Sequence, residues 1–123
     1  MDWITPLKGR NLNSSYLENQ FTILWEYYFP QIDLTKEYQF YPGRRFRWDF
    51  AAVEFKVAID IQGGIWSRGK MGHNSGSGIN KDCEKFCLAA SAGWLVFPLT
   101  DKMIELRWLE TIAQAIKDRQ ITC

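Results

Sequence analysis

The stretch FRWDFAAVEFKVAIDIQ, residues 46–62, decides the fold. Its first half predicts a strand over residues 46–53, because one set of alternating positions is apolar: Phe46, Trp48, Phe50 and Ala52. Its second half predicts a strand over residues 57–62, in which one face carries Val57, Ile59 and Ile61 and the other carries Ala58, Asp60 and Gln62. The connection at residues 54–55 is short, so we expect an antiparallel hairpin.

The segments before the hairpin predict one helix and one further strand. Apolar residues at helical spacing predict a helix over residues 16–29, opened by the capping-box pattern of Ser15 and Glu18. Residues 38–41 are expected to form a short strand that ends at a Pro-Gly turn signal.

The segments after the hairpin predict a loop, a helix, a strand and a last helix. Residues 63–79 contain six Gly and are expected to form a long loop, followed by a helix that Asn80 caps and Gly93 ends. The apolar run at residues 94–97 predicts a buried central strand. Thr100 is expected to cap the last helix, whose core positions are Met103, Leu106, Leu109, Ile112, Ala113 and Ile116.

This order of elements, α-β-β-β-α-β(-α), predicts one α/β domain over residues 1–123. We expect a mixed central sheet flanked by helices, with a core from about residue 15 to residue 117. A composition that is 46% hydrophobic and 15% aromatic is typical of a packed core and excludes a disordered chain. Since no segment has the roughly 20 apolar residues of a membrane span, we expect a soluble, cytoplasmic protein without a membrane partner.

The three cysteines do not form an even disulfide set, so we expect reduced thiols. Cys83 and Cys87 are four residues apart and share one face of the predicted helix. They are interpreted as buried thiols that pack on that helix. A zinc site completed by His73 is disfavoured, because these three residues lack a clear fourth ligand.

Asp49 and Asp60 are the candidate catalytic residues. Both occupy polar positions among apolar neighbours on the predicted hairpin, where a buried carboxylate is costly without a partner. Two carboxylates that face the same way are ligands that Mg²⁺ prefers, and a held divalent cation is what phosphodiester hydrolysis requires. Each residue also has an ordinary explanation: Asp49 can pair with Arg45 or Arg47, and Asp60 can mark the end of a strand.

The joint pattern resembles the PD-(D/E)XK nuclease superfamily, in its very-short-patch-repair-like branch with small phage and homing endonucleases. The resemblance covers roughly residues 15–105 and is carried by residues 44–50, 58–66, 82–85 and 93–94. It implies a restriction-endonuclease-like core and a Mg²⁺-dependent DNA endonuclease, with Mn²⁺ able to substitute and no organic cofactor. For a phage-encoded protein, the compartment would be the cytoplasm of the host cell.

The resemblance also assigns roles to single residues. Asp49 and Asp60 correspond to the acids of the second and third motifs, and Gln62 stands where many members carry Lys. This departure removes a positive charge near the scissile phosphate, and Gln62 cannot act as a general base. Glu18 corresponds to an acid on the first helix, although it also fits the capping box. His73 and Asp82 correspond to a histidine and an acid that join the site in this branch, although a loop histidine is often merely solvated.

DNA is the expected partner, and a homodimer is compatible with so small a chain. Residues 43–85 hold eight Lys/Arg against five Asp/Glu, so a phosphate backbone would prefer this part of the chain. The candidate contacts are Arg44, Arg45, Arg47, Arg68, Lys70, Lys81 and Lys85. Two rival hypotheses are a nuclease of a phage or mobile element that selects junctions or mismatches, and a non-catalytic DNA-binding module on a nuclease fold.

Overall fold

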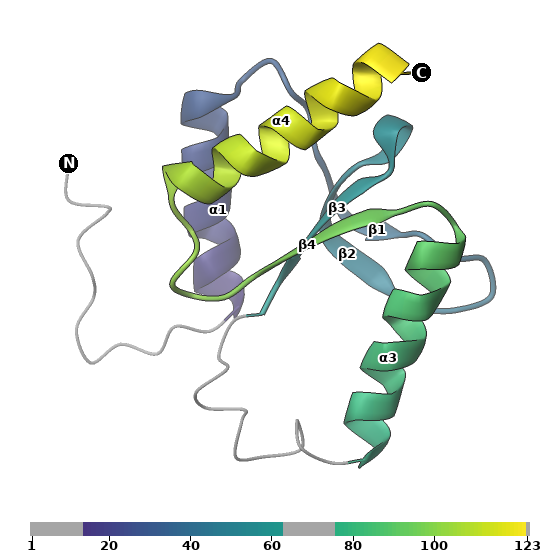
Figure 1. Ribbon diagram of the computed structural model, residues 1–123. Helices are drawn as coiled ribbons and strands as arrows, with labels where there is room; N and C mark the ends of the chain where they lie inside the picture. The colour runs from purple at the N-terminus through teal and green to yellow at the C-terminus, as the bar shows by residue number, and fades with distance from the viewer. Residues whose placement is uncertain (1–13, 63–75, 123) are drawn as a thin grey trace.

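The computed structural model describes residues 14–62 and 76–122 (Figure 1). Their elements are, in chain order, α1 (Ser14–Tyr28), β1 (Thr35–Gln39), β2 (Arg47–Ala52), the short 3-10 helix η2 (Val53–Phe55), β3 (Val57–Ile61), α3 (Gly76–Ser91), β4 (Leu95–Leu99) and α4 (Leu106–Thr122). The strands form one sheet in the order β1-β2-β3-β4. β1, β2 and β3 are antiparallel neighbours, whereas β4 runs parallel to β3. The prediction of one small α/β domain with a mixed sheet is confirmed.

The hydrophobic core is divided by the sheet into two clusters. Helices α1 and α4 pack on one face and α3 lies on the other (Figure 1). The cluster between α1, α4 and the sheet, here called the main core, consists of Leu17, Phe21, Leu24, Trp25, Phe50, Ala52, Val57, Ile59, Ile61, Leu99, Leu109, Ile112, Ala113 and Ile116. The cluster on the α3 side, here called the aromatic core, consists of Phe40, Trp48, Ala51, Ala58 and Ala89, with Tyr38 and Trp94 packed against it.

The alternation along β3 is as predicted, but the alternation along β2 is not. Trp48 packs in the aromatic core, whereas Phe50 packs in the main core, so the prediction that they share a face is wrong. Asp49 lies between them, and across the ladder Glu37 has a φ of +54°. The two faces of β2 thus change over at Asp49, opposite the left-handed residue of β1.

Strand β4 lies at an edge of the sheet, so the prediction of a buried central strand is wrong. It pairs with β3 on one side, and Leu95 is 38% exposed. The Leu95 N–H donates to the Lys56 carbonyl, and the Leu99 carbonyl accepts the Gln62 N–H. Since backbone groups alternate in direction along a strand, the nitrogen of the exposed Pro98 points away from β3.

Several predicted helix boundaries are also wrong. α3 begins at Gly76, so residues 76–79 are helical, and Asn80 lies inside the helix, where its side chain donates to Glu84. α4 begins at Leu106, while Thr100 accepts the Lys102 N–H through its hydroxyl. The prediction that Gly93 ends α3 is confirmed, because Gly93 has a φ of +86° and its N–H donates to the Ala90 carbonyl.

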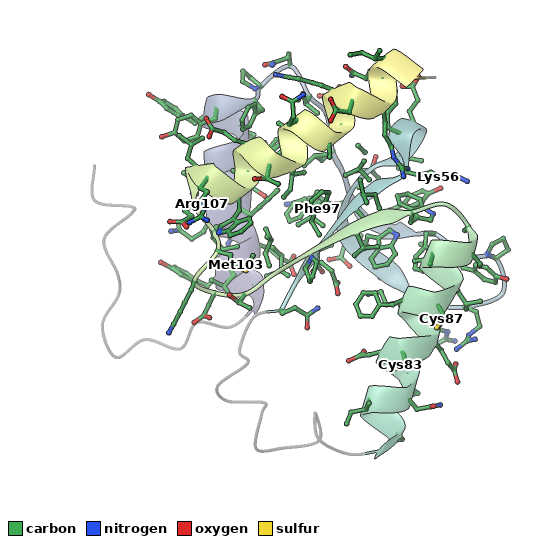
Figure 2. The ribbon with its side chains drawn as sticks, viewed as in Figure 1. Lys56, Cys83, Cys87, Phe97, Met103 and Arg107 are labelled. Atoms are coloured by element: carbon green, nitrogen blue, oxygen red, sulfur yellow. The ribbon has the colours of Figure 1, made fainter. Side chains whose placement is uncertain are left out.

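Helix α3 packs on the sheet mainly through its C-terminal half. Ala89 is its buried residue, and most of its other side chains are exposed. Cys83 and Cys87 lie along this helix (Figure 2) and are exposed free thiols, so the prediction of buried cysteines is wrong. Within the described residues, no helix combines the length and the apolar character needed to cross a bilayer.

Candidate active site

The hairpin of β2 and β3 positions Asp49 and Asp60 at the end of its ladder. Phe50 pairs with Ile59, and continuing this register by one residue places Asp49 opposite Asp60. The Asp49 Oδ2 atom accepts the Ile61 N–H at 2.6 Å. Asp49 therefore closes the end of the hairpin with its side chain, next to a second carboxylate.

Asp49 also belongs to a group of three acids from three elements. Potential ligand atoms of Glu18 on α1, Glu37 on β1 and Asp49 on β2 all lie within 4.8 Å of one another. The Glu18 carboxylate therefore lies on the side of α1 that faces the sheet, as its expected place in the site requires. α1 begins at Ser14 rather than after a cap at Ser15.

Sequence reasoning missed Glu37. Glu37 precedes the strand predicted at residues 38–41, whereas β1 runs over Thr35–Gln39 and Glu37 is its middle residue. Its left-handed backbone is uncommon for a residue other than Gly, and it aims the carboxylate at Asp49. An ion pair of 3.7 Å joins Glu37 to Arg47. The sequence around Glu37 carries no glycine or turn signal that could have revealed this conformation.

The carboxylate of Asp60 has a partner at each oxygen. The Lys85 Nζ atom of α3 lies 3.3 Å from Oδ1, and the Gln62 Nε2 atom donates to Oδ2 at 2.6 Å. The Asp60 side chain is 11% exposed and that of Lys85 is 15% exposed. The predicted proximity of Gln62 to Asp60 is thus present in the structure. The sequence predicts Lys85 as a DNA contact and gives no sign of its ion pair with Asp60.

The acids of this site hold protons more strongly than ordinary carboxyl groups. Burial, with smaller contributions from Asp60 and Glu18, raises the pKa of Asp49 to about 7, against the hydrogen bond from Ile61. Burial also raises the pKa of Asp60, an effect that Lys85 opposes. The pKa of Glu18 is raised by burial and by the nearby Glu37. Burial is the largest cause of all three shifts, so these carboxylates are costly to keep charged without a nearby cation.

The donor set fits a hard divalent cation. Mg²⁺ binds oxygen at about 2.1 Å, so two of its ligands lie at most about 4.2 Å apart. Potential ligand oxygens of Glu18, Glu37 and Asp49 lie within 4.8 Å of one another, which is close to that limit. This group does not include Asp60, whose two oxygens bond Lys85 and Gln62.

The predicted DNA-contacting residues differ in whether their charge is already paired within the protein. Arg44 pairs with Glu84 at 2.7 Å and stacks on Phe46, and this contact lowers the pKa of Glu84. Arg45 and Lys81 are exposed. Asp82 is exposed on α3, where its charge adds to the raised pKa of Asp60. Three predicted site residues lie outside the described part of the chain: Arg68, Lys70 and His73.

A scan against family models, a search of curated proteins and a search of solved structures each found no match to this chain. The resemblance to PD-(D/E)XK nucleases therefore stays a prediction that rests on the sequence motifs alone.

Proposed function

We propose that this protein is a metal-dependent endodeoxyribonuclease that hydrolyses DNA phosphodiester bonds on a restriction-endonuclease-like core. The observation that carries the proposal is the gathering of Glu18, Glu37 and Asp49 within 4.8 Å, beside Asp60 at the end of one hairpin. Within this group, Glu18 and Asp49 are half-buried carboxylates, which are costly to keep charged unless a cation is bound. Such a cost is typical of a functional site.

The chain's own residues would each have a separate role. Asp49 and Asp60, helped by Glu18 and Glu37, would hold Mg²⁺ or Mn²⁺. When bound, the ion supplies Lewis-acid polarisation of the phosphate and lowers the pKa of a coordinated water. Gln62 orients Asp60 through its amide N–H and takes no proton, because an amide is not a base at neutral pH. The exposed Arg45 and Lys81 would attract the DNA backbone.

Variants of the two hairpin acids test the proposed activity. We expect the purified protein to nick supercoiled plasmid with Mg²⁺ or Mn²⁺ and not with EDTA. Asp49→Asn and Asp60→Asn should each lower the cleavage rate by at least about a hundredfold, because several kcal/mol of charge stabilisation depend on the ion they hold. The rates are measured by gel electrophoresis over a time course.

The matched control is Asp33→Asn, which removes an exposed carboxylate from the connection between α1 and β1. It should cleave at the wild-type rate. A four-way junction tested beside linear duplex distinguishes a structure-selective enzyme from one that cuts ordinary DNA. If wild type cleaves none of these DNAs with either metal, the proposal is wrong.

A further inference from the structure

Lys85 has a largely buried side chain, although most residues of helix α3 are exposed. Its neighbours on α3 at positions 81–84 and 86–87 are exposed, yet its own side chain is 15% exposed. The Nζ atom lies 3.3 Å from Asp60 Oδ1 and 4.6 Å from the centre of the Trp48 ring. An ammonium group loses hydration when it is buried, and the carboxylate and the ring face offset that loss.

This contact places a positive charge directly beside Asp60, one of the acids of the proposed site. During hydrolysis, negative charge builds on the oxygens of the phosphate that is attacked. Gln62, which is bonded to the other oxygen of Asp60, is neutral and cannot offset that charge. Arg47 is paired with Glu37, and its side chain is 56% exposed. Among the described residues, Lys85 is the cation that contacts Asp60.

We propose that Lys85 is a catalytic residue that stabilises the scissile phosphate, delivered from α3 rather than from β3. The inference rests on the proposed function and adds to it the source of the positive charge. A water oxygen forms a bond to phosphorus and one phosphorus–oxygen ester bond breaks. The proton lost by the water passes to solvent, and the leaving oxygen takes a proton from solvent. Lys85 stays an ammonium throughout and donates a hydrogen bond to a non-bridging oxygen, while Asp60 holds it in place.

The test compares variants at saturating DNA and Mg²⁺. Lys85→Gln should lower the single-turnover cleavage rate by about a hundredfold, the scale for loss of one such donor. Its affinity for DNA without divalent cation should change far less. Lys85→Arg should recover part of the rate because it keeps the charge. Lys117→Gln removes an exposed lysine from α4 and serves as the matched control, with an unchanged rate.

A double variant that moves the positive charge from residue 85 to residue 62 gives a second test. Gln62 and Lys85 contact the two oxygens of the same carboxylate, so Gln62→Lys should restore cleavage to Lys85→Gln. Mn²⁺ binding, followed by calorimetry, should be as tight in Lys85→Gln as in wild type, since a lost cation does not repel metal. Loss of Mn²⁺ binding would instead show that Lys85 merely builds the site, and would overturn the proposal.

The outcomes for the two proposals can be told apart. If wild type cleaves and Lys85→Gln cleaves equally fast, Lys85 is not catalytic and the proposed function stands. If wild type cleaves no DNA, both proposals are wrong. Thermal melting checks that the variants fold. Should Lys85→Gln not fold, Lys85→Met, which keeps the aliphatic stem against Trp48, takes its place, and wild-type cleavage by that variant would overturn the assignment.

Discussion

At the scale of single residues, Asp49 is the point where the site and the fold meet. It accepts a backbone hydrogen bond from Ile61 and lies close to the carboxylates of Glu18 and Glu37, and the register of β2 and β3, continued by one residue, places it opposite Asp60. The strand pattern predicted its polar position. It did not predict Glu37, because a left-handed residue inside a strand depends on the partners around it and leaves no mark on alternation.

Asp49 should make the metal-free protein less stable as the pH rises. Its carboxyl has a pKa near 3.8 in the unfolded chain and about 7 in the folded one, so the folded state binds more protons between these values. The stabilising contribution is therefore complete below about pH 4 and is lost as the pH rises through 7. The full effect is at most about 4 kcal/mol, and solvent screening of this half-buried group reduces it to about 2 kcal/mol.

Urea unfolding in EDTA at pH 5, 6.5 and 8 measures this dependence. The raised pKa values of Asp60 and Glu18 add to the slope in the same direction. Asp49→Asn keeps an acceptor for Ile61 and should be more stable than wild type at pH 8, with a flatter profile. An Asp49→Asn profile as steep as that of wild type would show that another group sets the pH dependence.

At the scale of elements, the spacing of hydrophobic residues predicted which side chains of the last helix are buried, but the capping signals did not predict where α3 and α4 begin. The core positions Leu109, Ile112, Ala113 and Ile116 are buried as expected, because packing on one face imposes the helical period. Thr100 and Asn80 are good capping residues by type, yet neither begins a helix. Capping preferences are worth about 1 kcal/mol and yield to tertiary packing. β4 is as apolar as a central strand, so its place at the edge could not be predicted from composition.

The end of α3 offers a test at this scale. Gly93 has a φ of +86°, and a Cβ added there would meet Lys56 Cδ at 3.8 Å, an ordinary contact (Lys56 is marked in Figure 2). The cost of substitution therefore comes from the backbone and not from a clash. We expect Gly93→Ala to lower the free energy of unfolding by about 1 kcal/mol, Gly93→Asn by less and Gly93→Val by more.

Thermal or urea denaturation of the three variants measures this series. Asn tolerates the left-handed region and β-branched Val does not, so the ranking separates backbone strain from crowding. Equal losses for Asn and Val would show that the conformation of residue 93 is not what determines the stability of this turn.

At the scale of the whole molecule, the site lies where the two cores meet. Glu18 comes from α1 on the main-core side, and Lys85 comes from α3 on the aromatic-core side. Because the two faces of β2 change over at Asp49, the hairpin of β2 and β3 contacts side chains from α1 on one face of the sheet and from α3 on the other. The order of elements and the mixed sheet could be predicted from the sequence, since hydrophobic period and turn signals are local. The contact between α3 and the hairpin is distant in sequence, and no local pattern encodes it.

The edge strand β4 has a consequence for how the protein behaves at high concentration. An apolar strand with an open edge invites another chain to pair with it and to start an aggregate. Pro98 points its nitrogen outward from that edge and has no hydrogen to donate, so an added strand would lack one of the hydrogen bonds of the ladder. Pro98→Thr should therefore scatter more light on concentration than wild type, while Pro98→Lys, which restores the N–H but adds a repelling charge, should scatter less than Pro98→Thr. If both variants stay as clear as wild type, the edge is protected by something other than proline. A residue that adds nothing to the core would thus keep the molecules apart in a crowded solution.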